Sequence, residues 1–217
     1  MTAMILAAGL GSRMRPLTNH TPKPLLKVGG KPLIVWHIER LKSAGFINIV
    51  INVAYLGQQI IDYLGDGSRY GVHISFSDEQ NEGALETAGG IIKALPLLSD
   101  TFLVVNGDVW TDFSFDSSFT LTQNSLAHLV LIANPEHNLQ GDFCLDGTQE
   151  KYTFSGIGYY SKKMFKDVNY GKQSLAPLLF KAIAKNMLTT EYFSGVWHDI
   201  GTPERLESVN QQMNTNA

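Results

Sequence analysis

A buried strand that runs directly into a glycine-rich, cationic loop is the feature that most constrains this chain. The apolar run from Ala3 to Ala7 predicts the strand, and the loop that follows contains Ala8, Gly9 and Gly11. Glycines in such a loop let backbone N–H groups approach a ligand closely, as they do in loops that cradle phosphates. The arrangement is typical of an α/β fold with an anion at the carboxyl edge of its sheet.

Cationic side chains around the loop indicate that the anion is rich in phosphate. Arg13, Arg15 and Lys23 place permanent positive charges within reach of the loop. Arginine offers a planar fork to phosphate oxygens, and lysine offers a compact point charge. Lys23 stands between Pro22 and Pro24, which favour extended backbone and hold the direction of the lysine nearly constant.

The loop departs from two common nucleotide-binding motifs. In a dinucleotide fingerprint Met14 would be the third glycine, and Glu39, in a helical pattern, lies too far along to be the ribose-binding acid. The Walker motif is absent as well. A glycine turn with incidental charge is the alternative to a nucleotide-binding loop.

Residues Leu6 to Met14, together with Pro22-Lys23-Pro24-Leu25, resemble the signature of the sugar-1-phosphate nucleotidyltransferases. The resemblance runs the length of the chain and is closest to the branch that acts on N-acetylmuramate 1-phosphate. It implies a Rossmann-like (GT-A-type) three-layer α/β sandwich with a mostly parallel mixed central sheet. It also implies transfer of UMP from UTP to the sugar phosphate, with release of pyrophosphate, in cell-wall recycling. The loop residues expected to hold the nucleotide are Leu6, Ala7, Ala8, Gly9, Gly11, Ser12, Arg13, Met14 and Lys23.

Strand and helix patterns alternate along the chain, which predicts short crossovers and a largely parallel sheet. Its 217 residues suit one domain, in which residues 1–110 mainly bind the nucleotide and residues 111–217 mainly bind the sugar phosphate. Periodicity predicts strands at 3–7, 47–53, 72–76, 101–105, 126–133, 142–145, 152–160 and 187–193. It predicts helices at 32–44, 57–64, 86–95, 113–123, 174–184 and 203–213.

Two aspartates far apart in the sequence are candidate metal ligands. Asp108 follows the apolar run 102–105, and Asp199 ends a short apolar segment before a glycine turn. Aspartate is also common at turns and before helices, so each residue alone has an ordinary structural alternative. In the resembled family the aspartates of these segments bind the catalytic magnesium, so we expect Mg²⁺ at Asp108 and Asp199. The resemblance makes Arg13, Lys23 and Asp108 the expected catalytic residues.

The loop from Glu79 to Thr87 is expected to read the nucleobase, because it does so in the resembled family. Its candidate contacts are Gln80, Gly83, Glu86 and Thr87, and the alternative is a capped start of a helix. The residues expected to bind the sugar are Asn106, Gly141, Asp142, Ser155 and Gly156. Many relatives carry a Glu-Lys-Pro segment before the strand with Ser155, and this chain lacks it.

Composition limits the remaining classes. The net charge of −3 provides no global field for nucleic acid, and no apolar run approaches the roughly 18 residues of a membrane span. A single cysteine, Cys144, and no recognisable leader favour a cytoplasmic protein. We expect a monomer or small homo-oligomer that binds UTP and a sugar 1-phosphate.

Three alternatives stay open. The first is thymidylyl or guanylyl transfer to glucose or mannose 1-phosphate. The others are a non-catalytic sensor of nucleotide sugars and a dinucleotide oxidoreductase.

The histidines lack metal-ligand spacing and are expected to be structural, although His198 stands beside Asp199.

Overall fold

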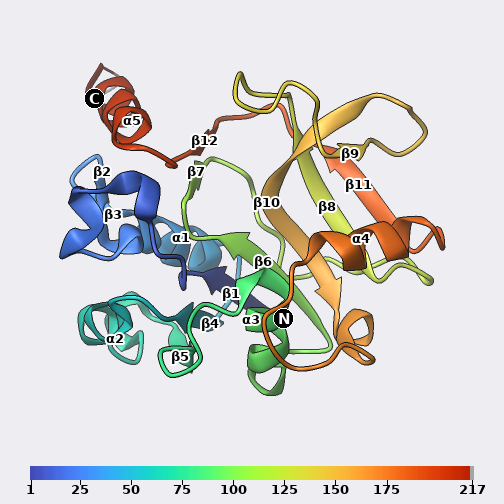
Figure 1. Ribbon diagram of the computed structural model, residues 1–217, viewed down its shortest axis with the longest axis horizontal. Coiled ribbons are helices and arrows are strands. Elements are labelled where there is room, and N and C mark those ends of the chain that lie inside the picture. Colours follow the sequence, from blue (N-terminus) through green and yellow to red (C-terminus); the bar gives the residue numbers. More distant parts are fainter. Residues whose placement is uncertain (216–217) are drawn as a thin grey trace.

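The apolar runs of the sequence assemble into one mixed sheet (Figure 1). The computed structural model describes the backbone of residues 1–215 and the side chains of residues 1–213. The strands of the sheet lie in the order β11 (Leu188–Tyr192), β8 (Ala127–Ile132), β10 (Lys151–Ser161), β6 (Thr101–Asn106), β1 (Thr2–Leu6), β4 (Asn48–Val53) and β5 (His73–Asp78), and β9 (Phe143–Cys144) pairs with β10.

Most neighbouring strands run parallel. β1 pairs in parallel with β4 and β6, β4 with β5, and β8 with β11. β10 runs antiparallel to β6, β8 and β9, which makes the sheet mixed. The predicted mostly parallel mixed sheet is therefore confirmed.

Helices cover both faces of the sheet, so the fold has three layers. Helices α1 (Leu33–Ser43) and α2 (Gly57–Leu64) pack on the face that receives Ala3 and Ile5 of β1. Helices α3 (Glu86–Ala94) and α4 (Ala176–Ile183) pack on the face that receives Met4. β1 is covered on both faces, which explains why Ala3 to Leu6 form a continuous apolar run.

Two short ribbons and the last helix complete the structure beside the main sheet. Strand β7 (Val109–Thr111) pairs with β12 (Trp197–Asp199), and β2 (Lys27–Val28) pairs with β3 (Lys31–Pro32). Figure 1 shows α5 (Pro203–Thr215) on the side of the N-terminal ribbon, away from β8 and β11. The described residues also form short 3₁₀ helices, which are η1 (Ser12–Met14), η2 (Leu17–Asn19), η3 (Lys23–Leu25), η4 (Ser68–Tyr70), η5 (Leu95–Leu97) and η6 (Lys162–Phe165).

The predicted helix at 113–123 is wrong, whereas every other predicted strand and helix is present within two residues of its expected bounds. Residues 113–123 are irregular because a side chain within the segment forms hydrogen bonds that compete with those of a helix. The Asp116 carboxylate accepts hydrogen bonds from both N–H and O–H of Ser118, an aspartate turn that competes with helix formation. Phe113, Phe115 and Phe119 pack against the core without helical backbone.

Among residues 1–215, no helix is both long and apolar enough to cross a membrane.

Candidate active site

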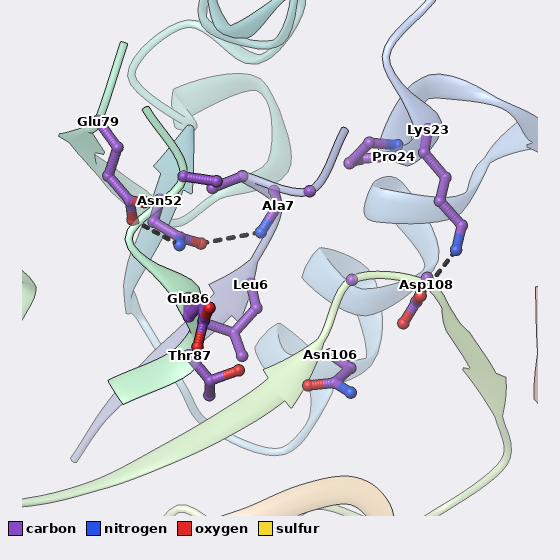
Figure 2. Close-up of a pocket in the computed structure, with 14 residues that line it drawn as sticks. Leu6, Ala7, Lys23, Pro24, Asn52, Glu79, Glu86, Thr87, Asn106 and Asp108 are labelled. Atoms are coloured by element: carbon purple, nitrogen blue, oxygen red, sulfur yellow. Dashed lines mark hydrogen bonds and ion pairs between the residues drawn. The ribbon is translucent and has the colours of Figure 1, made fainter. Parts of the chain in front are cut away.

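The carboxyl ends of the central strands meet at one edge of the sheet. The register places Leu6 of β1 opposite Asn52 of β4 on one side and Asn106 of β6 on the other. A pocket opens at this edge, where ligands bind in parallel α/β sheets (Figure 2). Its lining consists of Leu6, Ala7, Ala8, Gly9, Lys23, Pro24, Asn52, Glu79, Ala84, Glu86, Thr87, Asn106, Gly107 and Asp108.

The first part of the glycine loop lies in this pocket, as predicted from the sequence. Ala7 N–H donates to Asn52 Oδ1 over 2.8 Å, which ties the start of the loop to the end of β4. Gly11 has a φ of +60°, and a side chain there would meet Thr18 Cγ2 at 3.0 Å. Thr18 Oγ1 donates to Gly11 O over 2.8 Å, so this glycine serves the turn itself.

The second part of the loop lies outside the pocket lining. Met14 is fully buried in a small core with Val28, Ile200 and Val209. It anchors the loop to α5, and it does not face the pocket. Gly11, Ser12 and Arg13 also lie outside the lining, and the Arg13 side chain is exposed.

Lys23 and Asp108 meet at the rim of the pocket. Lys23 Nζ lies 2.7 Å from Asp108 Oδ2, and the two side chains are 12% and 33% exposed. Figure 2 shows the Lys23 side chain reaching down to Asp108, beside Asn106. The structure therefore brings these two predicted site residues together.

The Asp199 segment lies beside Asp108, as the sequence reasoning requires. β12 pairs with β7 so that Asp199 is opposite Val109, and Ile200 N–H donates to the backbone oxygen of Asp108 over 2.9 Å. The Asp199 carboxylate pairs with Arg205 and lies 3.7 Å from His137 Nε2. Within residues 1–213, no group of three or more His, Cys, Asp or Glu side chains is placed to hold a metal.

Two histidines near these aspartates are structural in character. The His198 ring packs against Trp110 with centroids 5.9 Å apart, and burial lowers its pKa. His37 on α1 is fully buried, and burial lowers its pKa to about 4, which the nearby Asp108 and Val109 only partly oppose. Both rings are therefore neutral at neutral pH.

The loop expected to read the nucleobase carries a buried carboxylate, Glu79, which was not among the predicted contacts. Glu79 accepts hydrogen bonds from Asn52 Nδ2 and from Leu85 N–H, each over 2.8 Å. The sequence feature that could have identified Asn52 is its position as a polar residue near the end of the apolar strand β4. This strand pairs with β1, which leads into the glycine loop. Glu79 directly follows β5 in the same way.

Of the predicted base contacts, Glu86 and Thr87 line the pocket, whereas Gln80 and Gly83 do not. The Gln80 amide donates to Asp78 over 3.1 Å. Glu86 has a φ of +61°, an uncommon conformation for a residue with a side chain.

A second pocket adjoins the first, because Thr87 and Asn106 line both. It contains the predicted sugar residues Gly141 and Asp142. The Asp142 carboxylate accepts from Phe154 N–H over 2.9 Å. The remaining lining residues are Phe143, Lys151, Phe154, Ser174, Leu175, Ala176, Leu179 and Phe180.

Ser155 and Gly156, which were also predicted to bind the sugar, lie behind this pocket and do not line either pocket. The Ser155 hydroxyl is buried and donates to Val130 O over 2.7 Å. The two residues form a bulge in β10, where the pairing with β8 shifts register. Gly156 has a φ of +80°, and a Cβ there would lie 2.5 Å from Asn106 Nδ2.

Residues 2–144 match the nucleotidyl transferase family. The chain belongs to this family. It is 52% identical to an N-acetylmuramate alpha-1-phosphate uridylyltransferase from Neisseria meningitidis serogroup B, over 96% of both chains. It is also 39% identical to a UTP–glucose-1-phosphate uridylyltransferase from Synechocystis, over 61% of this chain and 37% of that one.

Solved structures confirm the nucleotidyltransferase fold. A putative glucose-1-phosphate thymidylyltransferase from Bacillus anthracis superposes with a TM-score of 0.82 at 24% identity, over 98% of this chain and 95% of that one. The inositol-1-phosphate CTP transferase from T. maritima superposes with a TM-score of 0.74 at 21% identity, over 98% and 94%. At these identities the likeness establishes the Rossmann-like architecture of the family.

Proposed function

We propose that this nucleotidyltransferase transfers UMP from UTP to N-acetylmuramate 1-phosphate and releases pyrophosphate. The single observation that carries the proposal is the junction of the two pockets at Thr87 and Asn106, next to Asp108. A nucleotide in the first pocket and a sugar phosphate in the second would meet there. The choice of UTP and of this sugar rests on the activity named for the 52% identical Neisseria relative.

The reaction needs no protein nucleophile. An oxygen of the sugar phosphate attacks the α-phosphorus of UTP, a new P–O bond forms, and the bond to the β-phosphate breaks to release pyrophosphate. The attacking phosphate is already ionised at neutral pH. What opposes the reaction is repulsion between anions, so catalysis depends on positioning and on neutralising charge. We assign Lys23, at the pocket rim, to the phosphates, and we assign Arg13 as a second cation from the same loop, although it lies outside the pocket lining.

We assign a magnesium ion to Asp108 and Asp199, whose backbones lie side by side and whose carboxylates would exchange Lys23 and Arg205 for the metal. Asp199 ends β12 and Asp108 directly precedes the paired strand β7, and Mg²⁺ prefers one or two carboxylates with phosphate oxygens and water. Bound magnesium would supply charge neutralisation and orientation for the phosphates. Lys23 now holds Asp108, so the same lysine is placed to turn to a phosphate when that carboxylate takes a metal ion.

The proposed reaction belongs to recycling of cell-wall sugars and to the cytoplasm. The exposed, unpaired Cys144 fits a reducing compartment.

A grid of substrates tests the proposal. Pyrophosphate release is measured for UTP, dTTP and GTP against the 1-phosphates of N-acetylmuramate, glucose and mannose, with and without Mg²⁺. The proposal expects the greatest kcat/KM for UTP with N-acetylmuramate 1-phosphate. A preference for GTP and mannose 1-phosphate would instead match the guanylyltransferases to which the chain is 29% identical. Binding of UTP without any magnesium-dependent product would indicate a sensor.

A further inference from the structure

A relay of hydrogen bonds connects two walls of the nucleotide pocket beneath its surface. It runs from Ala7 N–H to Asn52 Oδ1, from Asn52 Nδ2 to Glu79 Oε1, and from Leu85 N–H to Glu79 Oε2, each over 2.8 Å. Figure 2 shows Asn52 between Glu79 and Ala7, with one dashed line on each side. The relay joins residues 78 positions apart in the chain, at the first loop and at the start of α3.

Asn52 and Glu79 border the pocket, but their side chains are covered. Glu79 has no exposed surface and Asn52 is 3% exposed. Every hydrogen bond of the relay is directed at another protein group, so neither side chain is free to read a base or to move a proton. Their effect on a ligand must pass through the backbone at Ala7 and Leu85.

The backbone at Leu85 is held from two sides. Its N–H donates to Glu79, and its carbonyl accepts from Gln173 N–H over 3.0 Å. The next residue, Glu86, has the uncommon φ of +61° and lines the pocket. Strained backbone of this kind persists only where the surroundings over-determine it, and the relay is one of those constraints.

Gly90 on α3 leaves the space in which the relay lies. A Cβ at this position would be 2.8 Å from Glu79 Oε1 and 2.9 Å from Asn52 Nδ2. Glycine lowers helix stability relative to alanine, so its presence inside α3 fits a requirement for room at that point.

We propose that Asn52 and Glu79 are positioning residues for the nucleotide. Without touching UTP, they hold the phosphate loop at Ala7 and the base-facing turn at Leu85 at the separation that the nucleotide needs. The inference rests on the proposed function in that UTP is the nucleotide.

Exchanging the two chemical groups gives a sharp test. Asn52→Asp removes the N–H₂ group that donates to Glu79. Glu79→Gln turns one acceptor of the carboxylate into an N–H₂ group, which then faces either Asn52 Nδ2 or Leu85 N–H, and both of these are donors. The double variant restores all three hydrogen bonds, because Gln can donate to Asp and still accept from Leu85. It also keeps the net charge of the natural chain.

The readouts are UTP affinity by calorimetry with Mg²⁺, the KM for the sugar phosphate, and Tm. We expect each single variant to bind UTP at least about tenfold more weakly, since a buried polar group loses its partner. The double variant should recover to within about threefold of the natural chain, by the same reasoning. The KM for the sugar phosphate should change far less than the UTP affinity. A general loss of stability would affect both substrates alike.

A matched control exists on the surface. Gln58 Nε2 donates to Asp62 Oδ1 over 2.7 Å on exposed α2, the same amide–carboxylate contact outside the pocket. Gln58→Glu with Asp62→Asn should leave UTP affinity unchanged.

Single variants that bind UTP as the natural chain does would overturn the inference and leave the proposed function intact. A double variant that folds with natural Tm but stays as weak as the singles would also overturn it, since charge and not hydrogen bonding would then matter at position 79. A natural chain that binds no UTP would overturn the proposed function as well. If a single variant does not fold, Gly90→Ala is used in its place, because its Cβ would press on the relay. We expect this variant to bind UTP more weakly. Unchanged UTP binding would contradict the inference.

Discussion

The Lys23 ammonium donates to the Asp108 carboxylate over 2.7 Å, although the residues stand 85 positions apart in the chain. Lys23 approaches from a short turn after the glycine loop, and Asp108 lies in the turn between β6 and β7. The pair holds a permanent cation and a carboxylate in place at the rim of the pocket. Under the proposed function, the pair keeps Lys23 at the rim until Asp108 takes a metal ion and the lysine turns to a phosphate.

Removing the charge of Lys23 tests its role directly. Lys23→Met should lower kcat by roughly 10²-fold or more, the usual effect of losing one transition-state donor. The measurement is pyrophosphate release at saturating substrates. Lys31→Met is the control, because Lys31 pairs with Glu39 on the surface and lies outside both pockets. Near-full turnover in Lys23→Met would refute the assignment.

The carboxylates of Asp108 and Asp199 should set the magnesium requirement. Asp108→Asn and Asp199→Asn should each raise the Mg²⁺ concentration for half-maximal rate by at least about tenfold, since each removes one anionic ligand. A magnesium titration of pyrophosphate release measures this shift. Asp116→Asn, on an exposed aspartate turn, should leave the titration unchanged. An unaltered titration in both site variants would show that the metal, if required, binds elsewhere.

Gly156 should tolerate no side chain, because two constraints act on it. Gly156→Ala forces an alanine to a φ of +80° and places its Cβ 2.5 Å from Asn106 Nδ2. Gly147→Ala is the matched control, with a φ of +78° and no atom within 4 Å of the added Cβ. Both variants should lose about 1–2 kcal/mol of unfolding free energy from backbone strain, and Gly156→Ala about 1–3 kcal/mol more from the clash. Equal losses in denaturant titrations would mean that Asn106 moves aside freely.

His37 should make the protein less stable in mild acid. Its pKa is lowered by burial from 6.5 to about 4, so between these values the unfolded chain binds a proton that the folded chain does not. Stability is therefore complete above pH 6.5 and falls as the pH drops toward 4, by about 3 kcal/mol in total. His37→Phe should flatten the pH dependence of the unfolding free energy in this window. An equally steep dependence in the variant would place the titrating group elsewhere.

Local patterns in the sequence were sufficient for most of the architecture. The apolar run before Gly9 reads as a buried strand because hydrophobic periodicity depends on neighbouring residues alone. The prolines beside Lys23 were a poorer guide, because they favour extended backbone whereas Lys23 begins the 3₁₀ turn η3. The predicted helix at 113–123 is wrong because the Asp116 carboxylate binds the N–H and O–H of Ser118, a turn that competes with helical backbone.

The sequence by itself determined the strand-and-loop unit, the alternation that produces the parallel sheet, and the residue types suited to a polyanion. Only the tertiary structure decided which side chains share the site. It brought Asp199 beside Asp108 through β12 and β7, turned Met14 and the Ser155 hydroxyl inward, and joined Asn52 to Glu79 under the pocket. The physical reason is that strand register and side-chain direction depend on contacts between distant segments, which no local pattern records.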